Sequence, residues 1–391
     1  MTKQPVTPKP PELGSLVTEL RSLIHSARHS IATTVNTLQV LTNFEIGRRI
    51  VEHEQNGEKR AGYGKELLKT LSAGLTDEFG KGFSERNLEY IRRFYLTWKD
   101  KVGEFPRRLL GNSSAISQKP SAKLPEAQKG QTPSDQFDIS AKPSRKYLFT
   151  LSWSHYVLLL TIKNPDERSF YEIEATQSGW SIPELKRQVA SSLYERLALS
   201  RDKESIRQLA YTGQLIVKPE DMLKEPYVLE FLGLDEKTGY SESDLESAII
   251  DQLEQFLLEL GKGFLFEARQ KRFTFDEDHF FVDLVFYNRL LRCYVIIDLK
   301  LDKLSHQDLG QMQMYVNYFD RYVKTADENP TIGILLCKRK KDAIVELTLP
   351  ADANIHAREY QLYLPSKEIL QQKLIGWVRE QEARYEYRNT H

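Results

Sequence analysis

Two carboxylates in the last third of the chain interrupt apolar, strand-like runs, and no other feature constrains the fold as much. Asp283 lies inside the run Phe280–Tyr287, and Asp298 lies near the end of the run Leu291–Leu299. Both runs are rich in β-branched and aromatic residues, so they predict two strands joined by a turn around Asn288–Arg289. A charge in an apolar strand is costly unless it is paired or bound to a metal. The two acids therefore predict a functional site at one end of a hairpin.

A lysine stands two positions after the second acid. Period-2 geometry puts Asp298 and Lys300 on one face of the strand and Leu299 on the other. Phosphodiester hydrolysis needs a divalent cation that neutralises developing charge and makes a nucleophile of bound water. Mg²⁺ prefers hard oxygen ligands and keeps several waters, so two or three carboxylates suffice, and a lysine beside them can stabilise the transition state. The alternative is a simple same-face ion pair, which contributes little to stability.

A third acid is available on the helix predicted over residues 241–261. Glu254 lies at the edge of the buried stripe of this helix, and Glu246 competes with it for the third position. Downstream, Gln311 and Tyr315 are four residues apart on a predicted helix, so they share a face that can reach the site or the substrate backbone. The apolar residues that form the buried stripe of the first helix are Leu245, Ile249, Leu253, Phe256, Leu257 and Leu260.

The distance between the two aspartates depends on the hairpin loop. A two-residue turn at Asn288–Arg289 would pair Asp283 with Tyr294. Asp298 would then lie four residues further along its strand, roughly 13 Å away at ~3.3 Å per residue. A common site requires a wider loop, a bulge or strong strand twist.

These residues and their neighbours resemble a known family. Asp283, fourteen intervening residues, then Asp298 and Lys300, with a Gln-x3-Tyr helix after them, are similar to the PD-(D/E)XK nuclease superfamily. The phrases FLLELGKGF, VDLVFYN, IIDLK and GQMQMYVNY resemble the YhcG family of endonucleases specifically. The segments FEIGRRIVEHEQNGEKRAGYGKELL and FGKGFSERNLEYIRRFY are similar to the N-terminal domain of that family. The resemblance covers nearly the whole chain apart from residues 105–145.

The resemblance implies a restriction-endonuclease-like α/β sandwich that depends on Mg²⁺, with Mn²⁺ as the alternative ion. It assigns metal ligation to Asp283 and Asp298, with Glu254 as the acid from the helix. It makes Lys300 the catalytic lysine.

The resemblance also assigns an accessory catalytic pair, Gln311 and Tyr315. The chain departs from the family pattern at two positions. Val282 precedes the first acid where relatives carry proline, and Asp298 stands where many relatives use Glu. The second departure shortens the reach to the metal by one methylene.

Two domains are expected. Residues 13–235 predict a helical N-terminal domain that binds DNA or a partner, and residues 244–385 predict the nuclease domain, so the fold class is multidomain α plus α/β. Residues 105–145 are rich in Ser, Pro, Gln and Lys and lack an aromatic residue between Phe105 and Phe137. Such a segment buries too little apolar surface to offset its ordering entropy, so we interpret it as a disordered insertion.

The segment YGKELLKTLSAGLTDEFGKGFSERNLEYIRRFYLTW predicts a helix, a GKG turn and a second helix with Ser84 as its N-cap. This order resembles a helix-turn-helix, in which Arg86, Arg92 and Arg93 would contact the phosphates of DNA. The alternative is an assembly domain that forms a homo-oligomer or binds another protein. Its contact residues would be Phe94, Tyr95 and Trp98.

The composition is that of a soluble protein, and no apolar run reaches the ~18 residues of a membrane span. Without a signal-peptide core at the N-terminus, we expect a cytoplasmic protein in which Cys293 and Cys337 are buried thiols. Residues 1–145 contain 23 Lys+Arg against 16 Asp+Glu, and residues 146–391 contain 32 against 39. A basic front half suits a polyanionic partner, and an acidic rear half suits a metal.

The sequence therefore predicts a metal-dependent endonuclease that acts on DNA, with RNA left open because a metal and a lysine do not select the sugar. The competing interpretation is a nucleic-acid-binding or assembly protein whose nuclease fold is inactive or auxiliary. Metal-dependent cleavage separates the two.

Overall fold

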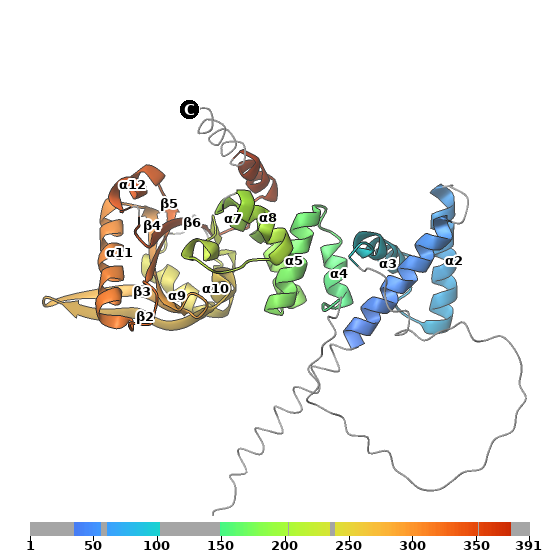
Figure 1. Ribbon diagram of the computed structural model, residues 1–391, viewed down its shortest axis with the longest axis horizontal. Helices are drawn as coiled ribbons and strands as arrows, with labels where there is room; N and C mark the ends of the chain where they lie inside the picture. Colours follow the sequence, from blue (N-terminus) through green and yellow to red (C-terminus); the bar gives the residue numbers. More distant parts are fainter. Residues whose placement is uncertain are drawn as a thin grey trace, which may run out of the picture. The chain divides into compact units, whose positions relative to one another are not determined.

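The structure, a computed structural model, divides by compactness into two units, Met1–Thr161 and Ile162–His391, and each is described here by itself (Figure 1). The insertion predicted at residues 105–145 lies outside the described part of the chain. No helix in that part is long and apolar enough to cross a membrane. The residues that the structure describes are 35–55, 61–101, 149–201, 203–234, 239–350 and 352–376.

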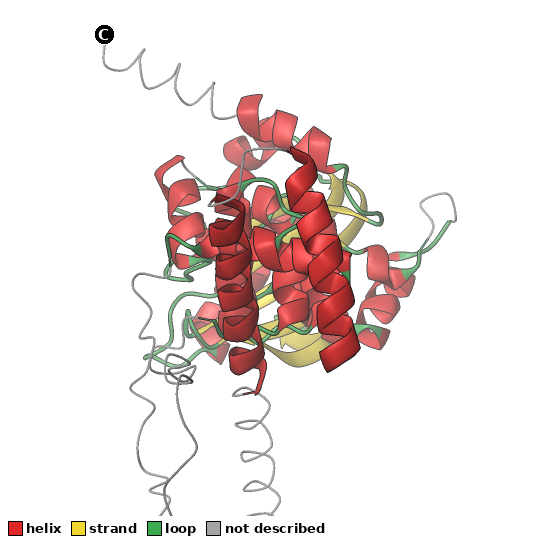
Figure 2. Cartoon of the chain, turned by 90° about the vertical axis from the view of Figure 1, so that its right-hand side faces the viewer, coloured by secondary structure: helices red, strands yellow, loops and turns green. Residues whose placement is uncertain are grey.

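The described residues of the first unit form helices, drawn in red in Figure 2. Gly80 and Gly82 adopt positive φ angles of 77° and 117°, which end one helix and turn the chain into the next. The Ser84 side chain accepts a hydrogen bond from Asn87 N–H, so the predicted N-cap is confirmed. The helices span 35–55, α2 (Ala61–Phe79), α3 (Glu85–Trp98) and α4 (Trp153–Leu159).

Aromatic residues of α3 form the core of this first unit. Phe94 is fully buried and its ring lies 5.0 Å from Tyr156 and 5.1 Å from Phe149. Trp98 is 1% exposed and contacts Phe94 at 4.9 Å. Phe94 and Trp98 are therefore not available as contact residues for a partner, because they pack inside their own unit.

The second unit begins with short helices that precede the sheet. α6 starts after Ser181, which forms a capping box with Glu184, and a proline stands in its first turn. The elements are α5 (Pro165–Ser178), α6 (Ile182–Ala190), α7 (Leu193–Leu199), α8 (Lys203–Thr212), η2 (Pro219–Met222) and η3 (Glu230–Leu232).

A six-stranded mixed sheet follows, with strand order β1-β6-β5-β4-β3-β2 (Figure 1). β2, β3 and β4 are antiparallel neighbours, whereas β4, β5, β6 and β1 pair in parallel. The strands are β1 (Tyr227–Val228), β2 (Phe264–Phe275), β3 (Asp278–Asn288), β4 (Cys293–Lys303), β5 (Ile332–Arg339) and β6 (Ile355–Gln361). The helices around it are α9 (Glu242–Asp251), α10 (Leu253–Leu260), α11 (His306–Tyr318), the π-helical turn η4 (Phe319–Val323) and α12 (Asp342–Thr348).

Each face of the sheet has its own apolar core, as alternation in β4 requires. Ile297 and Leu299 pack with α9 and α10 in one core, and Ile296 packs with α11 in the other. The predicted α/β sandwich is thus confirmed. Cys293 and Cys337 are buried free thiols, as expected.

Candidate active site

The loop between β3 and β4 has four residues, 289–292, rather than a two-residue turn around Asn288–Arg289. Asn288 fixes it, because its Oδ1 accepts hydrogen bonds from the N–H groups of Leu290 and Leu291 at 3.0 and 3.1 Å. Such side-chain to backbone bonds are typical of Asx-type turns. The wider loop shifts the register of the whole hairpin.

The shifted register brings the two predicted acids together. Leu284 pairs with Ile297, so the next positions on the two strands are Asp283 and Asp298. Leu299 N–H donates to Asp283 Oδ2 at 2.9 Å, which holds this carboxylate against β4. The wider loop therefore brings both acids to a common site.

Asp298 and Lys300 form a close, largely buried pair. Lys300 Nζ lies 2.8 Å from Asp298 Oδ2, and Asp298 is only 4% exposed. Burial, followed by the neighbouring carboxylate of Asp283, raises the pKa of Asp298 to about 7 against the opposing effect of Lys300. Burial lowers the pKa of Lys300, but the adjacent Asp298 outweighs it and the net pKa is raised, so the ammonium stays charged.

Two further side chains belong to this cluster, and the sequence pattern indicated neither of them. Glu242 Oε2, in the first turn of α9, lies 3.6 Å from Lys300 Nζ. Gln270 of β2 donates from Nε2 to Asp283 Oδ1 at 3.0 Å and also to Glu246 Oε2. Gln270 has a φ of 46°, an uncommon backbone conformation for a residue with a side chain. Alternation of apolar and polar residues carries no signal for it, because its partners lie on other elements.

The two candidates for the third acid occupy different environments. Glu246 is 3% exposed on α9, where Arg269 and Gln270 of β2 donate to its carboxylate. Glu254 is exposed on α10, beyond a break at Gln252 where φ and ψ are −115° and 33°. The structure thus links Glu246, through Gln270, to Asp283, and does not bring Glu254 into this hydrogen-bonded network.

The predicted accessory pair lies on α11. Gln311 Nε2 donates to the Tyr315 hydroxyl, and Tyr315 is buried. Burial raises the pKa of Tyr315, and the nearby charges of Asp298 and Asp283 add to this effect. The tyrosine hydroxyl therefore lies within electrostatic reach of the two carboxylates.

The donor set fits a hard divalent cation held in part by water. Within the described part of the chain, no three acidic, histidine or cysteine side chains converge as a complete metal cage. Mg²⁺ does not require one, since one or two carboxylates plus waters and substrate oxygens are its usual ligands. Asp283 and Asp298 supply two, on adjacent strands.

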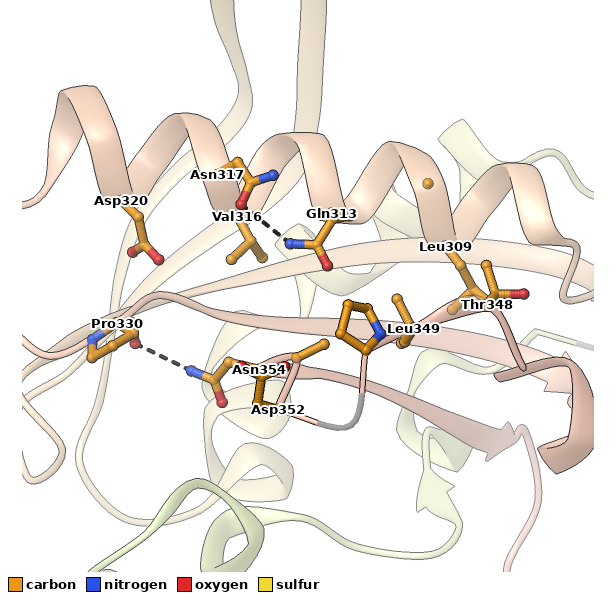
Figure 3. Close-up of a pocket in the computed structure, with 13 residues that line it drawn as sticks. Leu309, Gln313, Val316, Asn317, Asp320, Pro330, Thr348, Leu349, Asp352 and Asn354 are labelled. Carbon is orange, nitrogen blue, oxygen red and sulfur yellow. Dashed lines mark hydrogen bonds between the residues drawn. The ribbon is translucent and has the colours of Figure 1, made fainter. Parts of the chain in front are cut away.

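A cavity also opens elsewhere in the same unit. About 580 Å³ opens between α11 and residues 348–354, and none of the predicted catalytic residues lines it (Figure 3). Its amides already bond, as Gln313 Nε2 donates to Asn317 Oδ1 at 3.2 Å and Asn354 Nδ2 to the Pro330 carbonyl at 3.2 Å. The carboxylate pair lies instead in the middle of β3 and β4, away from this cavity.

The three arginines predicted to contact DNA are engaged within the first unit. Arg92 Nε lies 2.7 Å from Glu54 Oε2, and Arg93 donates to the Leu160 carbonyl at 2.9 Å. Arg86 is exposed and donates to the Tyr90 hydroxyl at 3.1 Å. The Arg86 bond is to a residue one turn away on the same helix, so binding a new partner would break no contact with another segment.

A mixed sheet with helices on both faces, paired aspartates on neighbouring strands and a lysine two positions on define a PD-(D/E)XK nuclease domain. Residues 220–375 match the family model described as the YhcG PDDEXK nuclease domain, and residues 19–110 and 123–196 match the DUF1016 N-terminal domain. The chain belongs to the YhcG family of nucleases.

One relative shows the extent of the match. Over 356 residues, 90% of this chain and 91% of that protein, the sequence is 43% identical to Putative nuclease YhcG of Escherichia coli (strain K12). Among solved structures, the crystal structure of a repair endonuclease from Pyrococcus abyssi matches 33% of this chain and 50% of its own, at 21% identity and a TM-score of 0.22. That likeness is too low to carry an argument.

Proposed function

We propose that the chain is a Mg²⁺-dependent endonuclease that hydrolyses phosphodiester bonds of DNA. The observation that carries the proposal is the pairing of Asp283 with Asp298 on adjacent strands, with Lys300 Nζ 2.8 Å from the second carboxylate. A second carboxylate beside the buried Asp298 is costly in a structural role. They are expected where a cation and a phosphate are to be held.

Each residue has a separate task in this mechanism. Asp283 and Asp298 would hold the cation, and a bound cation would supply neutralisation of developing charge and a more acidic water. Lys300 orients the attacking water and stabilises the negative charge of the transition state. Glu246, rather than Glu254, is the better supported third acid, because its bond to Gln270 connects it to Asp283.

Gln311 and Tyr315 are proposed to contact the substrate backbone. Their mutual hydrogen bond orients the tyrosine hydroxyl, and the proximity of Tyr315 to both aspartates supports this role. The N-terminal domain, residues 13–235, is proposed to target the nuclease to DNA or to a partner, with Mn²⁺ as the alternative metal in the catalytic domain.

A cleavage assay tests the proposal. Linear and plasmid DNA, and RNA of the same sequence, are incubated with Mg²⁺, Mn²⁺ or a chelator. Asp298→Ala should abolish cleavage, and Lys300→Ala should slow it by about 100- to 1000-fold, the scale on which removal of one transition-state donor acts. Asp302→Ala is the matched control, because Asp302 lies exposed on the same strand. Metal-independent cleavage, or wild-type rates in Asp298→Ala, would refute the assignment.

The third acid has its own paired test in the same assay. Glu246→Gln keeps the shape of the buried side chain and should reduce cleavage, whereas Glu254→Gln should leave it unchanged. The reverse result would restore Glu254 as the third acid. An inactive wild-type protein that still binds nucleic acid would favour the auxiliary function instead.

A further inference from the structure

A ladder of aromatic rings runs along one side of α11 and its π-helical extension. Phe273 of β2 stacks on Tyr318 with ring centroids 4.0 Å apart and planes at 20°. Tyr318 lies 5.2 Å from Tyr322, and Tyr322 lies 6.4 Å from Phe275. We call these four rings, Phe273, Phe275, Tyr318 and Tyr322, the aromatic groove.

The outer end of the aromatic groove is open to solvent. Phe275 is 53% exposed and Tyr322 is 62% exposed, although both are large aromatic side chains next to one another. A cavity of about 300 Å³ lies over the rings. This is the lower end of the range for small-ligand pockets, so it suits a flat ring better than a helix or a strand. Besides the four rings, the cavity is lined by Gly310, Gln313, Met314, Asn317 and Arg321.

The inner end of the groove reaches the candidate active site. The Phe273 ring makes an edge contact with Tyr315, at 5.6 Å and 87°. Tyr315 bonds to Gln311 and packs in the same buried cluster as Val282, the residue before Asp283. The groove is therefore in direct contact with Tyr315, one of the two residues proposed to contact the substrate backbone.

The backbone at the outer end of the groove adopts an uncommon helical conformation. Residues Phe319–Val323 form a π-helical turn directly after α11, and such turns occur frequently at functional sites. This turn places Tyr322 and Arg321 on the cavity with Tyr318. A guanidinium at the edge of a row of rings can pair with a phosphate.

The chemistry of the lining identifies the occupant. Aromatic faces stack on any base, and Arg321 can neutralise a phosphate. The acidic hairpin tip, residues 276–278, follows Phe275 along the chain. An apolar peptide would make poor use of the guanidinium, whereas a nucleotide uses both the rings and the guanidinium.

We propose that the aromatic groove stacks an unpaired base of the DNA strand held in the active site, so that the preferred substrates carry a single-stranded segment next to the cleaved bond. The inference rests on the proposed nuclease function and names its substrate class. A fully paired duplex keeps its bases stacked inside the helix and gains nothing from the groove.

Binding and cleavage are measured separately to test this. Single-stranded, flapped and fully paired oligonucleotides carry 2-aminopurine, whose fluorescence is quenched when it stacks. In the Lys300→Ala background, which keeps the DNA intact, binding should quench the probe in unpaired segments. The double variant Phe275→Ala/Tyr322→Ala should lose the quenching, and its affinity for unpaired DNA should fall about ten-fold or more per stacked base. Its cleavage of paired duplex should remain unchanged.

Two controls separate ring stacking from a general loss of exposed apolar surface. Tyr211→Ala removes a tyrosine that is 81% exposed on α8 and should change neither quenching nor affinity. Phe275→Leu/Tyr322→Leu keeps apolar area without rings, and it should fail as the alanine variant does.

The contrary outcomes are distinct. Full activity of the leucine variant, or equal loss on duplex and unpaired DNA, would overturn the stacking proposal while leaving the nuclease function intact. Sedimentation that shows a wild-type dimer and a monomeric alanine variant would assign the groove to a second copy of the chain. Normal quenching with no metal-dependent cleavage of any DNA would refute the nuclease function instead.

Discussion

Asp298 has two neighbours that act on its charge in opposite directions. Lys300 Nζ, 2.8 Å away, favours the carboxylate, whereas Asp283 and burial favour the protonated acid and together prevail. A buried acid with a raised pKa is a frequent mark of a functional site, though ion-pair networks produce it as well. Asp283 supplies a second carboxylate here. A structural ion pair with Lys300 needs only one carboxylate, so a cation site is the better explanation.

Gln270 is the residue on which the geometry of these acids depends. It donates to both Asp283 and Glu246, and such supporting bonds typically change metal affinity or activity by about 10- to 100-fold when removed. We expect Gln270→Ala to fold, to need more Mg²⁺ for half-maximal cleavage, and to recover much of its rate at saturating Mg²⁺. A Mg²⁺ titration of the cleavage rate measures this. Arg272→Ala, also exposed on β2, is the control, and an unchanged Mg²⁺ requirement in Gln270→Ala would rule out a positioning role.

His356 on β6 makes stability depend on pH. Within the described residues its Nε2 has no hydrogen-bond partner, and burial followed by Arg358 lowers its pKa to about 4. Between this value and the ordinary ~6.5 the unfolded chain binds more protons, so the free energy of unfolding decreases as pH falls through that window.

The lowered pKa of His356 sets the size of the expected loss in the free energy of unfolding. At about 1.4 kcal/mol per pKa unit the loss approaches ~3 kcal/mol as an upper estimate. Denaturant unfolding of wild type and His356→Gln at pH 7 and pH 4.5 measures it, and taking the difference between the two proteins cancels the other titrating groups. The variant should lose less stability on acidification, and parallel pH profiles would show that His356 does not titrate as expected.

At the scale of elements, the hairpin shows what local patterning can and cannot predict. Alternation identified β3 and β4 and put Asp298 and Lys300 on one face. It could not set the register, because loop length depends on bonds from the Asn288 side chain to the backbone of Leu290 and Leu291. Only this four-residue loop places Asp283 opposite Asp298, so the site was predictable as a set of residues but not as a geometry.

The helix before the sheet shows a second limit. A continuous helix over 241–261 puts Glu254 at the edge of the buried stripe, but the backbone leaves the helical region at Gln252 and the periodicity does not carry across. Glu246 lies before this break, and its partners Arg269 and Gln270 belong to β2. Contacts between distant segments decide which acid is buried, and a single sequence contains no local signal for them.

At the scale of the whole molecule, compactness divides the chain between residues 161 and 162, while the domain bounds expected from the sequence, 13–235 and 244–385, stay a prediction. A buried ion network explains why the helices after residue 162 belong with the sheet. Glu259 of α10, fully buried, pairs with Arg196 of α7 and lies 3.5 Å from Arg187 of α6. Separating these helices from α10 would expose the buried charges or leave them unpaired, which is strongly unfavourable.

The helix α3 carries the three arginines that are predicted to contact DNA. Arg92 and Arg93 are bonded to Glu54 and to the Leu160 carbonyl, whereas Arg86 is exposed and bonded only to neighbouring Tyr90 among the described contacts. We therefore expect Arg86→Ala to weaken DNA binding and to reduce the log–log salt slope by about one unit, the effect of one lost phosphate contact. Arg92→Ala should instead lower the melting temperature, because it breaks the link between α3 and the helix at 35–55.

Titration of DNA binding over a range of salt concentrations, with thermal unfolding of each variant in parallel, distinguishes these effects. Lys99→Ala, an exposed cation just past the end of α3, is the matched control. A slope that falls for Arg92→Ala and not for Arg86→Ala would mean that Arg92 leaves Glu54 to bind phosphate. A slope unchanged in all three variants would mean that α3 does not contact DNA. The first unit would then act as a protein-interaction domain, because its basic residues would have no role in holding a polyanion.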